Sequence, residues 1–247
     1  MIYSKQSGTG EAVVLIHGFC ETHEVWQNII PALNKTNFVI AIDLPGFGKS
    51  SLPNSLNTID EISEEVYLHL ISQGITQCVM IGHSLGGYVT LSIAKHHPQF
   101  LKRFGLFHST SFADPEDKKV NREKSMSFIK KYGVEPFTNA FVPTLFADSE
   151  NPYIHSLLIK AAQCKLYTIL KYTEAMKNRN DRTDVLKNFA RPILIIAGTL
   201  DQAVPFENSM EESKLVKHLT FKKLNDIGHM GMYECPEIVS DILKEFV

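Results

Sequence analysis

The residues with the clearest chemical potential lie in the segment 82–87, whose sequence is GHSLGG. This segment follows an apolar run at 78–81 and precedes a helical pattern, so a G-x-S-x-G sequence falls at a strand-to-helix turn. A sharp turn of this kind holds a serine hydroxyl above the end of the strand, and its glycines let neighbouring backbone approach closely. The N-terminus of the next helix favours negative charge that develops there. The pattern predicts Ser84 as a nucleophile.

A serine hydroxyl is a poor nucleophile unless a base removes its proton and an acid orients that base. Two later segments supply these residues. Asp201 follows an apolar run at 193–197, and His229 follows a later predicted strand at 220–224. The chain order Ser, Asp, His is the one that accompanies a G-x-S-x-G turn. We therefore expect Ser84, Asp201 and His229 to meet at one edge of a sheet as nucleophile, orienting acid and base.

Other titratable residues compete for these roles. His108 follows a predicted strand at 104–107 and is the nearest alternative base, but it precedes any plausible acid in the chain. Asp226 lies near His229, and Asp114 follows another strand, so both are alternative acids whose default interpretation is a surface-loop carboxylate. No histidines, cysteines or carboxylates show the spacing of metal ligands, and we expect no metal site.

A serine nucleophile also requires backbone N–H groups that stabilise an oxyanion. The N–H of Leu85, directly after the nucleophile, is one expected donor. The other is the N–H of Phe19, in the loop that follows the first strong strand. Gly18 lets this loop turn toward the site, and His17 is expected to brace it through a hydrogen bond.

The elements that position these residues are short apolar strands that alternate with amphipathic helices. Because several strands are continuous runs rich in Val and Ile, both faces of the sheet should be covered, as in a parallel sheet. A capping box at Thr58 and Glu61 starts one helix, and Pro236 starts the last. The pattern predicts an α/β fold with a doubly wound, mostly parallel sheet. The predicted strands are 12–16, 38–42, 78–81, 104–107, 193–197 and 220–224.

The alternation breaks at 111–188, where helical patterns occur without a convincing strand. We expect a core at 1–110 and 189–247 and a helical insertion that covers the site, because ligands bind at the carboxyl ends of parallel strands. Basic residues lie near its start (Lys118, Lys119, Arg122 and Lys124). They either form a solvated helix face or attract the anionic tail of a substrate. The expected substrate-pocket residues are Phe19, His83, Phe128, Phe141, Phe146 and Met230.

Composition limits the class of protein. A formal net charge of −2 gives no sign of a nucleic-acid or anionic-membrane partner. Four scattered cysteines without a C-x-x-C pair indicate free thiols in a reducing compartment. The early apolar runs are too short for a signal peptide or a membrane span, so we expect a cytoplasmic protein.

Five motifs together resemble the α/β-hydrolase superfamily: HGF at 17–19, DLPGFGKS at 43–50, GHSLGG at 82–87, GTLD at 198–201 and GH at 228–229. The resemblance covers nearly the whole chain outside the insertion, which it identifies with the helical cap of that family. It implies a hydrolase that needs no cofactor and acts with water on a small-molecule acyl substrate. The chain begins close to its first strong strand, so the family's leading strands are expected to be short or partly missing.

The default expectation for the reaction is hydrolysis of a small or medium ester. Thioesters, lactones and carbon–carbon bonds β to a carbonyl are open to the same residues, because a fold does not define its function. A member of the family in menaquinone synthesis carries an arginine where Tyr88 stands, which argues against that activity. The alternative outside enzymes is a hydrolase-like receptor that binds a small ligand beneath its cap. The sequence does not indicate an oligomeric state.

Overall fold

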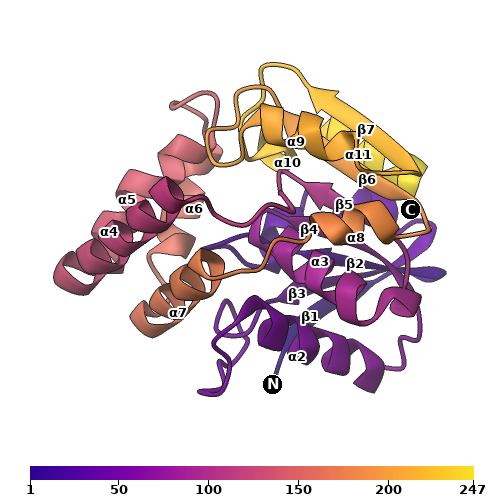
Figure 1. Cartoon of the computed structure of the whole chain (residues 1–247), viewed down its shortest axis with the longest axis horizontal. Helices are drawn as coiled ribbons and strands as arrows, with labels where there is room; N and C mark the ends of the chain where they lie inside the picture. The colour runs from indigo at the N-terminus through magenta and orange to yellow at the C-terminus, as the bar shows by residue number, and fades with distance from the viewer.

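A seven-stranded sheet with the order β1-β3-β2-β4-β5-β6-β7 forms the centre of the computed structural model, which describes residues 1–247 (Figure 1). β1 pairs with β3 in the antiparallel sense, and every other neighbouring pair is parallel. The predicted mostly parallel α/β sheet is therefore confirmed. The strands are β1 (Tyr3–Ser7), β2 (Glu11–Ile16), β3 (Asn37–Asp43), β4 (Cys78–His83), β5 (Leu101–Phe107), β6 (Ile193–Gly198) and β7 (Leu219–Leu224).

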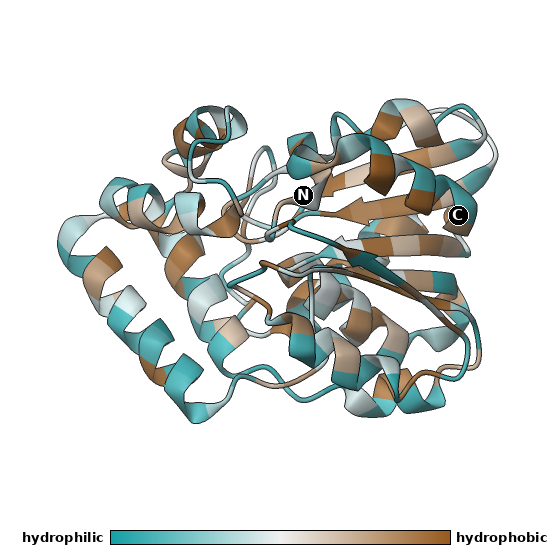
Figure 2. Ribbon diagram, turned by 90° about the horizontal axis from the view of Figure 1, so that it is seen from above, coloured by the Kyte–Doolittle hydropathy of each residue, from teal (hydrophilic) through white to brown (hydrophobic).

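Only β1 escaped the strand pattern in the sequence. Its residues, YSKQS, are polar, and none of them is fully buried. An edge strand faces solvent and needs no continuous apolar run, so it leaves little signal in the sequence. β2 to β6, by contrast, contain apolar runs, whereas β7 at the other edge (LTFKKL) mixes apolar and polar residues. Helices lie on both sides of the sheet in Figure 2.

The helices pack in the layers that a doubly wound sheet requires. α2 (Ile59–Ser72) packs on α3 (Leu85–His96), whereas α1 (Ile30–Leu33) packs on α11 (Pro236–Phe246), which α10 (Gly231–Glu234) precedes. The predicted capping box is present at the start of α2: Glu61 N donates to Thr58 Oγ1 at 3.1 Å, and Thr58 N donates to Glu61 Oε2 at 3.0 Å. α9 (Phe206–Ser213) packs beside β6.

Two helical expectations differ in detail. Trp26, Ile29, Ile30 and Leu33 have the spacing of one helical stripe, which predicts a single helix. All four are buried, but the segment is divided between a 3₁₀ turn, η1 (His23–Trp26), and the short α1. Pro31 lacks the N–H that a continuous helix would need there. The apolar pattern after Pro236 predicts that Ile238, Ile242 and Phe246 are buried, but Ile238 in α11 is 56% exposed. Val239 and Leu243 fill the buried face instead, and Ile238 lies about 100° around the helix from Val239.

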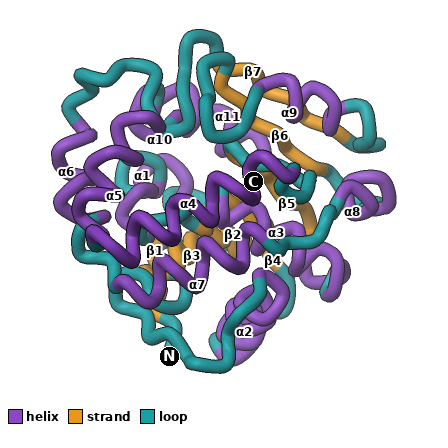
Figure 3. The backbone as a smooth tube through the Cα atoms, turned by 60° about the vertical axis from the view of Figure 1, so that its left-hand side comes forward, coloured by secondary structure: helices purple, strands orange, loops and turns teal.

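The segment between β5 and β6 contains helices only. α4 packs on α5 and α7, and these helices lie at one end of the sheet in Figures 1 and 3. α8 instead packs on α3 beside the sheet. None of the helices in the chain is long and apolar enough to cross a bilayer. The helices of the segment are α4 (Glu116–Tyr132), α5 (Val134–Phe141), η3 (Val142–Leu145), α6 (Tyr153–Ala161), α7 (Leu166–Lys177) and α8 (Thr183–Asn188).

Candidate active site

Ser84 occupies a strained turn between β4 and α3. Its backbone angles are φ 49° and ψ −114°, in a region that residues other than glycine rarely adopt. Three hydrogen bonds hold this conformation: Ser84 N donates to Phe107 O at 2.9 Å, and Ser84 O accepts from Gly87 N at 2.9 Å and from Ser109 Oγ at 2.7 Å. The turn therefore lies at the carboxyl end of β4, and hydrogen bonds to both the N–H and the C=O of Ser84 fix its backbone.

Gly82 permits the close approach of α3 to β4. A Cβ atom on this residue would overlap the backbone of Gly86 and Gly87, which are part of the helix and cannot rotate away. The distance between the two elements around Ser84 therefore depends on the absence of a side chain at position 82.

We expect Gly82→Ala to lower the free energy of unfolding by about 3 kcal/mol, because strand and helix must separate to admit the methyl group. Gly74→Ala is a matched control, since Gly74 has φ +81° but no atom lies within 4 Å of the position that a Cβ would take. That variant should cost only about 1 kcal/mol, from the backbone alone. Urea unfolding measures both. Equal midpoints for the two variants would contradict the close-packing interpretation.

Asp201 and His229 form a buried hydrogen-bonded pair. His229 Nδ1 lies 2.8 Å from Asp201 Oδ2, while Asp201 Oδ1 accepts from Ala203 N at 2.9 Å and Val204 N at 2.8 Å. An ionised carboxylate can only accept, so Nδ1 of His229 carries the proton and its Nε2 is left to accept one. The backbone of His229 is also fixed, because its N–H donates to Leu145 O of η3 at 2.7 Å.

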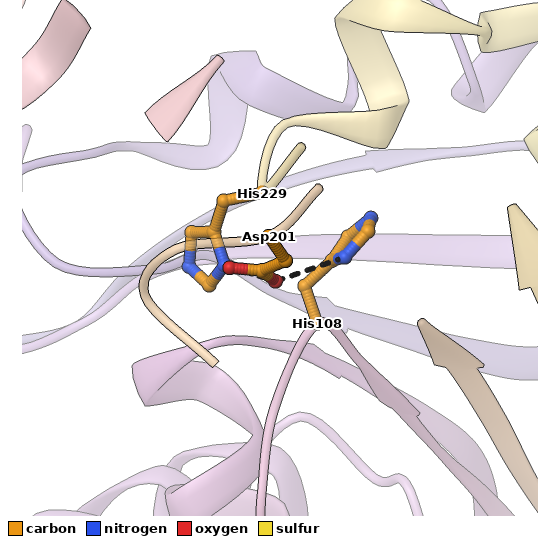
Figure 4. A group of neighbouring side chains, drawn as sticks. All are labelled: His108, Asp201 and His229. Atoms are coloured by element: carbon orange, nitrogen blue, oxygen red, sulfur yellow. Dashed lines mark hydrogen bonds and ion pairs between the residues drawn. The ribbon is translucent and has the colours of Figure 1, made fainter. Parts of the chain in front are cut away.

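A second histidine, His108, shares the same carboxylate. Its Nδ1 lies 3.2 Å from Asp201 Oδ2, and Figure 4 shows the two imidazoles on either side of Asp201. Burial lowers the pKa of His108 to about 4, against the opposing attraction of Asp201. Burial alone would raise the pKa of Asp201, but the contacts with His229 and His108 outweigh it and hold that pKa well below its usual range. Asp201 is therefore ionised, with a hydrogen bond from His229 Nδ1, while His108 Nδ1 accepts from Gly198 N at 3.3 Å.

The side chains of His108, Asp201 and His229 are close enough to be considered as metal ligands, since their ligand atoms all lie within 4.8 Å of one another. Both Nδ1 atoms are, however, directed at one oxygen of an ionised carboxylate, which needs hydrogen-bond donors. A cation would have to displace the proton on His229 Nδ1 and would face the Gly198 N–H that donates to His108 Nδ1. We therefore interpret the group as hydrogen bonded, and the expectation of no metal site stays a prediction.

Ser84 and His229 line one cavity, but no hydrogen bond joins them in this structure. Such bonds are often long or absent without substrate and tighten when it binds. Rotation about χ1 moves the serine hydroxyl between staggered positions without any movement of the backbone. The three predicted residues thus come from three strand ends, with the acid–base contact formed and the nucleophile contact open.

The two expected oxyanion donors also lie near the strand ends. Leu85 is the first residue of α3, where an N–H has no acceptor within its own helix. Phe19 N makes no hydrogen bond within the protein. His17 braces the loop as expected: its Nε2 accepts from Leu44 N at 2.9 Å, and its Nδ1 lies 2.7 Å from Gly18 O.

Glu21 and His83 link this loop to the loop of His229. The Glu21 carboxylate accepts from Gly18 N at 2.7 Å and lies 3.1 Å from His83 Nδ1, whose ring continues through Nε2 to His229 O at 2.9 Å. Both partners of His83 can only accept, so both ring nitrogens carry protons. Burial would lower the pKa of His83, but Glu21 raises it overall. Burial would raise the pKa of Glu21, and His83 lowers it overall.

These opposite shifts predict a pH window for stability. Glu21 contributes above its ordinary pKa of 4.5 and loses its contribution as the pH falls. His83 contributes below its ordinary value of 6.5 and loses its contribution as the pH rises through the raised pKa. The stability lost in Glu21→Gln, about 3 kcal/mol, should therefore be largest between these two values. Urea unfolding at pH 5.5 and pH 9 measures the difference.

Glu24→Gln is the control, since Glu24 is exposed and pairs with Lys160 on the surface. Exposed pairs contribute little, so this variant should show a small loss without such a window. A constant loss in Glu21→Gln across the pH range would contradict the charged pair.

The cavity has a volume of about 560 Å³. Of the expected pocket residues, Phe19 and Phe141 line it. The other four are not among its lining residues: His83, Phe146 and Met230 are buried, and Phe128 is 40% exposed. Phe137 of α5 and Met176 of α7 supply further apolar surface, so the helical segment contributes directly to the cavity wall.

Comparison with known proteins agrees with this arrangement. A family model described as the alpha/beta hydrolase fold matches residues 11–148, and the chain belongs to that family. A thermophilic esterase from Thermogutta terrifontis superposes with a TM-score of 0.93 at 24% identity, covering 99% of this chain and 92% of the esterase. An enol-lactonase from Burkholderia xenovorans gives a TM-score of 0.91 at 19% identity, with coverages of 99% and 95%. A lipase from Psychrobacter immobilis is 24% identical over 265 residues, covering 100% of this chain and 80% of the lipase.

Proposed function

We propose that this protein is a serine hydrolase that cleaves a small or medium acyl ester through an acyl-enzyme on Ser84. The observation that carries the proposal is the hydrogen bond of 2.8 Å between Asp201 and His229, on a cavity that Ser84 and His229 both line. Esterase, lipase and lactonase relatives support an acyl substrate. Residues 111–188 are proposed to act as a cap over a core formed by 1–110 and 189–247.

In the proposed reaction, Ser84 Oγ attacks the carbonyl carbon while Nε2 of His229 takes its proton. The N–H groups of Phe19 and Leu85 stabilise the oxyanion, and Asp201 stabilises the imidazolium that forms. The alcohol leaves with the proton from His229. A water molecule, deprotonated by His229, then attacks the acyl carbon and releases the acid and the serine. The net reaction converts one ester and one water molecule into one alcohol and one carboxylic acid.

A p-nitrophenyl ester series with acyl chains from acetate to octanoate tests the proposal, together with a fluorophosphonate probe and mass mapping of the labelled residue. We expect rapid turnover, a maximum at a short or medium chain, and a label on Ser84. Labelling without turnover of esters, thioesters or lactones would favour the receptor alternative. Absence of both labelling and turnover would contradict the proposed nucleophile.

A further inference from the structure

The cavity carries an excess of positive charge on the wall formed by α4 and the end of α7. Its charged lining residues are three cations (Lys118, Arg122 and Arg179) and two carboxylates (Asp114 and Asp117). The chain as a whole has a formal charge of −2, so this excess is a local feature. A net positive charge on the wall of a cleft favours ligands that carry negative charge.

Asp114 and Arg179 use most of their hydrogen-bonding groups on partners within the protein. The Asp114 side chain is fully buried and accepts from Arg122 Nε and, at 2.5 Å, from Arg179 Nη1. Arg179 also donates to Met176 O at 2.9 Å and to Phe112 O at 2.8 Å, and it stacks 4.1 Å from the ring centre of Tyr88. One carboxylate therefore faces two guanidinium groups, and Arg179 is held by the protein itself.

Arg122 is only partly satisfied. Apart from the Nε contact with Asp114, its one further partner is the thioether sulfur of Met176, a weak acceptor, 3.7 Å from Nη1. Nη2 makes no hydrogen bond within the protein. A planar guanidinium with an unused edge is suited to a carboxylate. Lys118 lies one turn earlier on the same helix, and its Nζ touches only Ala203 O, at 3.0 Å.

We propose that the cavity binds an ester that carries a second, ionised carboxylate away from the scissile bond, with Arg122 and Lys118 as its recognition residues. This inference rests on the proposed function, because the ester carbonyl must lie at Ser84. The aromatic side chains of Phe137 and Phe141 contact the apolar part of the molecule between its two polar ends. A volume of about 560 Å³ leaves room for a substrate that extends from Ser84 to α4.

Two matched substrate pairs test this. Mono-p-nitrophenyl glutarate against p-nitrophenyl butyrate places the carboxylate on the acyl side, and 4-carboxyphenyl butyrate against phenyl butyrate places it on the alcohol side. We expect kcat/KM to favour the anionic member of at least one pair, and the preference to fall by about tenfold or more in Arg122→Gln. Added salt should weaken the preference in the wild type.

Lys119→Gln is the matched control, because it removes the same charge from the same helix but Lys119 pairs with Glu116 and does not line the cavity. It should keep the wild-type preference, and Arg122→Lys should keep part of it. Lys118→Gln breaks no ion pair and keeps the test usable if the Arg122 variants do not fold. It should reduce the preference several-fold.

The outcomes separate the two proposals. If no ester in either pair is hydrolysed, the proposed function fails. If neutral esters are hydrolysed but the wild type shows no preference for an anionic partner, only the inference about Arg122 is overturned. An equal loss on neutral and anionic esters in Arg122→Gln, with Lys118→Gln unchanged, would likewise overturn it and leave Arg122 as a structural partner of Asp114.

Discussion

Replacing Ser84 with alanine should lower kcat for p-nitrophenyl butyrate by about 10⁴-fold or more and abolish fluorophosphonate labelling. The reason is that Ser84 supplies the proposed nucleophile on the cavity shared with His229, whereas the hydroxyl of Thr110 on the same cavity donates to Glu212. The backbone of the turn should be unchanged, since alanine has the same Cβ and its hydrogen bonds use main-chain atoms of residue 84. We therefore expect the free energy of unfolding to stay within about 1 kcal/mol of the wild-type value.

Ser156→Ala is a suitable control, because Ser156 is an exposed serine on α6 whose hydroxyl bonds only to Tyr153 O. It should retain activity and labelling. Stopped-flow assays at saturating ester, with urea unfolding of the same preparations, make the comparison. Wild-type turnover in a folded Ser84→Ala protein would remove the basis of the proposed function.

Replacing Asp201 with asparagine should lower kcat by about 10³- to 10⁴-fold with little change in KM. The Asp201 carboxylate accepts from His229 Nδ1 and from two backbone amides, and His108 Nδ1 lies 3.2 Å from it. An asparagine amide has one acceptor oxygen, so its NH₂ group must face either the histidines or the backbone donors. If it faces His229, the ring adopts the other tautomer, with the proton on Nε2, and can no longer accept the serine proton.

The same substitution should alter acid stability. Because the pKa of Asp201 is lowered, its contribution to stability is present above its ordinary value of 3.8 and is lost as the pH falls below it. The Asp201→Asn protein should therefore lose less stability than the wild type between pH 5 and pH 3, as measured by urea unfolding. Asp226→Asn is the control, since Asp226 is exposed. A large loss of activity in Asp226→Asn, with Asp201→Asn active, would reassign the acid.

Local sequence patterns were sufficient for the framework of this molecule. Five of the six predicted strands contain apolar runs, and the buried sheet demands such runs, so the pattern located them to within a few residues. The sixth, β7, mixes apolar and polar residues. The order of Ser84, Asp201 and His229 after three of these strands placed the candidate residues at one sheet edge, because parallel strands end on the same side. The same reasoning could not locate β1, because its polar sequence contains no apolar run.

Interactions between distant segments were harder to predict. His108 was considered only as an alternative base, whereas it shares the Asp201 carboxylate through a contact that depends on the separation of two loops. Glu21 had no signal of its own, since a single carboxylate after a glycine loop resembles a surface residue until His83 is placed beside it. The pocket residues were the least predictable, because the helices of an insertion can be oriented in many ways with one and the same apolar pattern.

The bond from His229 N to Leu145 O has a mechanical consequence. Leu145 belongs to η3, in the helical segment between β5 and β6 that supplies part of the cavity wall. The backbone of His229 is therefore attached to that segment as well as to the sheet. A movement of the helical segment that displaces η3 must either break this hydrogen bond or move His229 with it. If His229 is the base, as proposed, entry of a ligand through such an opening is coupled to the alignment of its imidazole. A more rigid helical segment would then slow ligand exchange but keep the imidazole aligned.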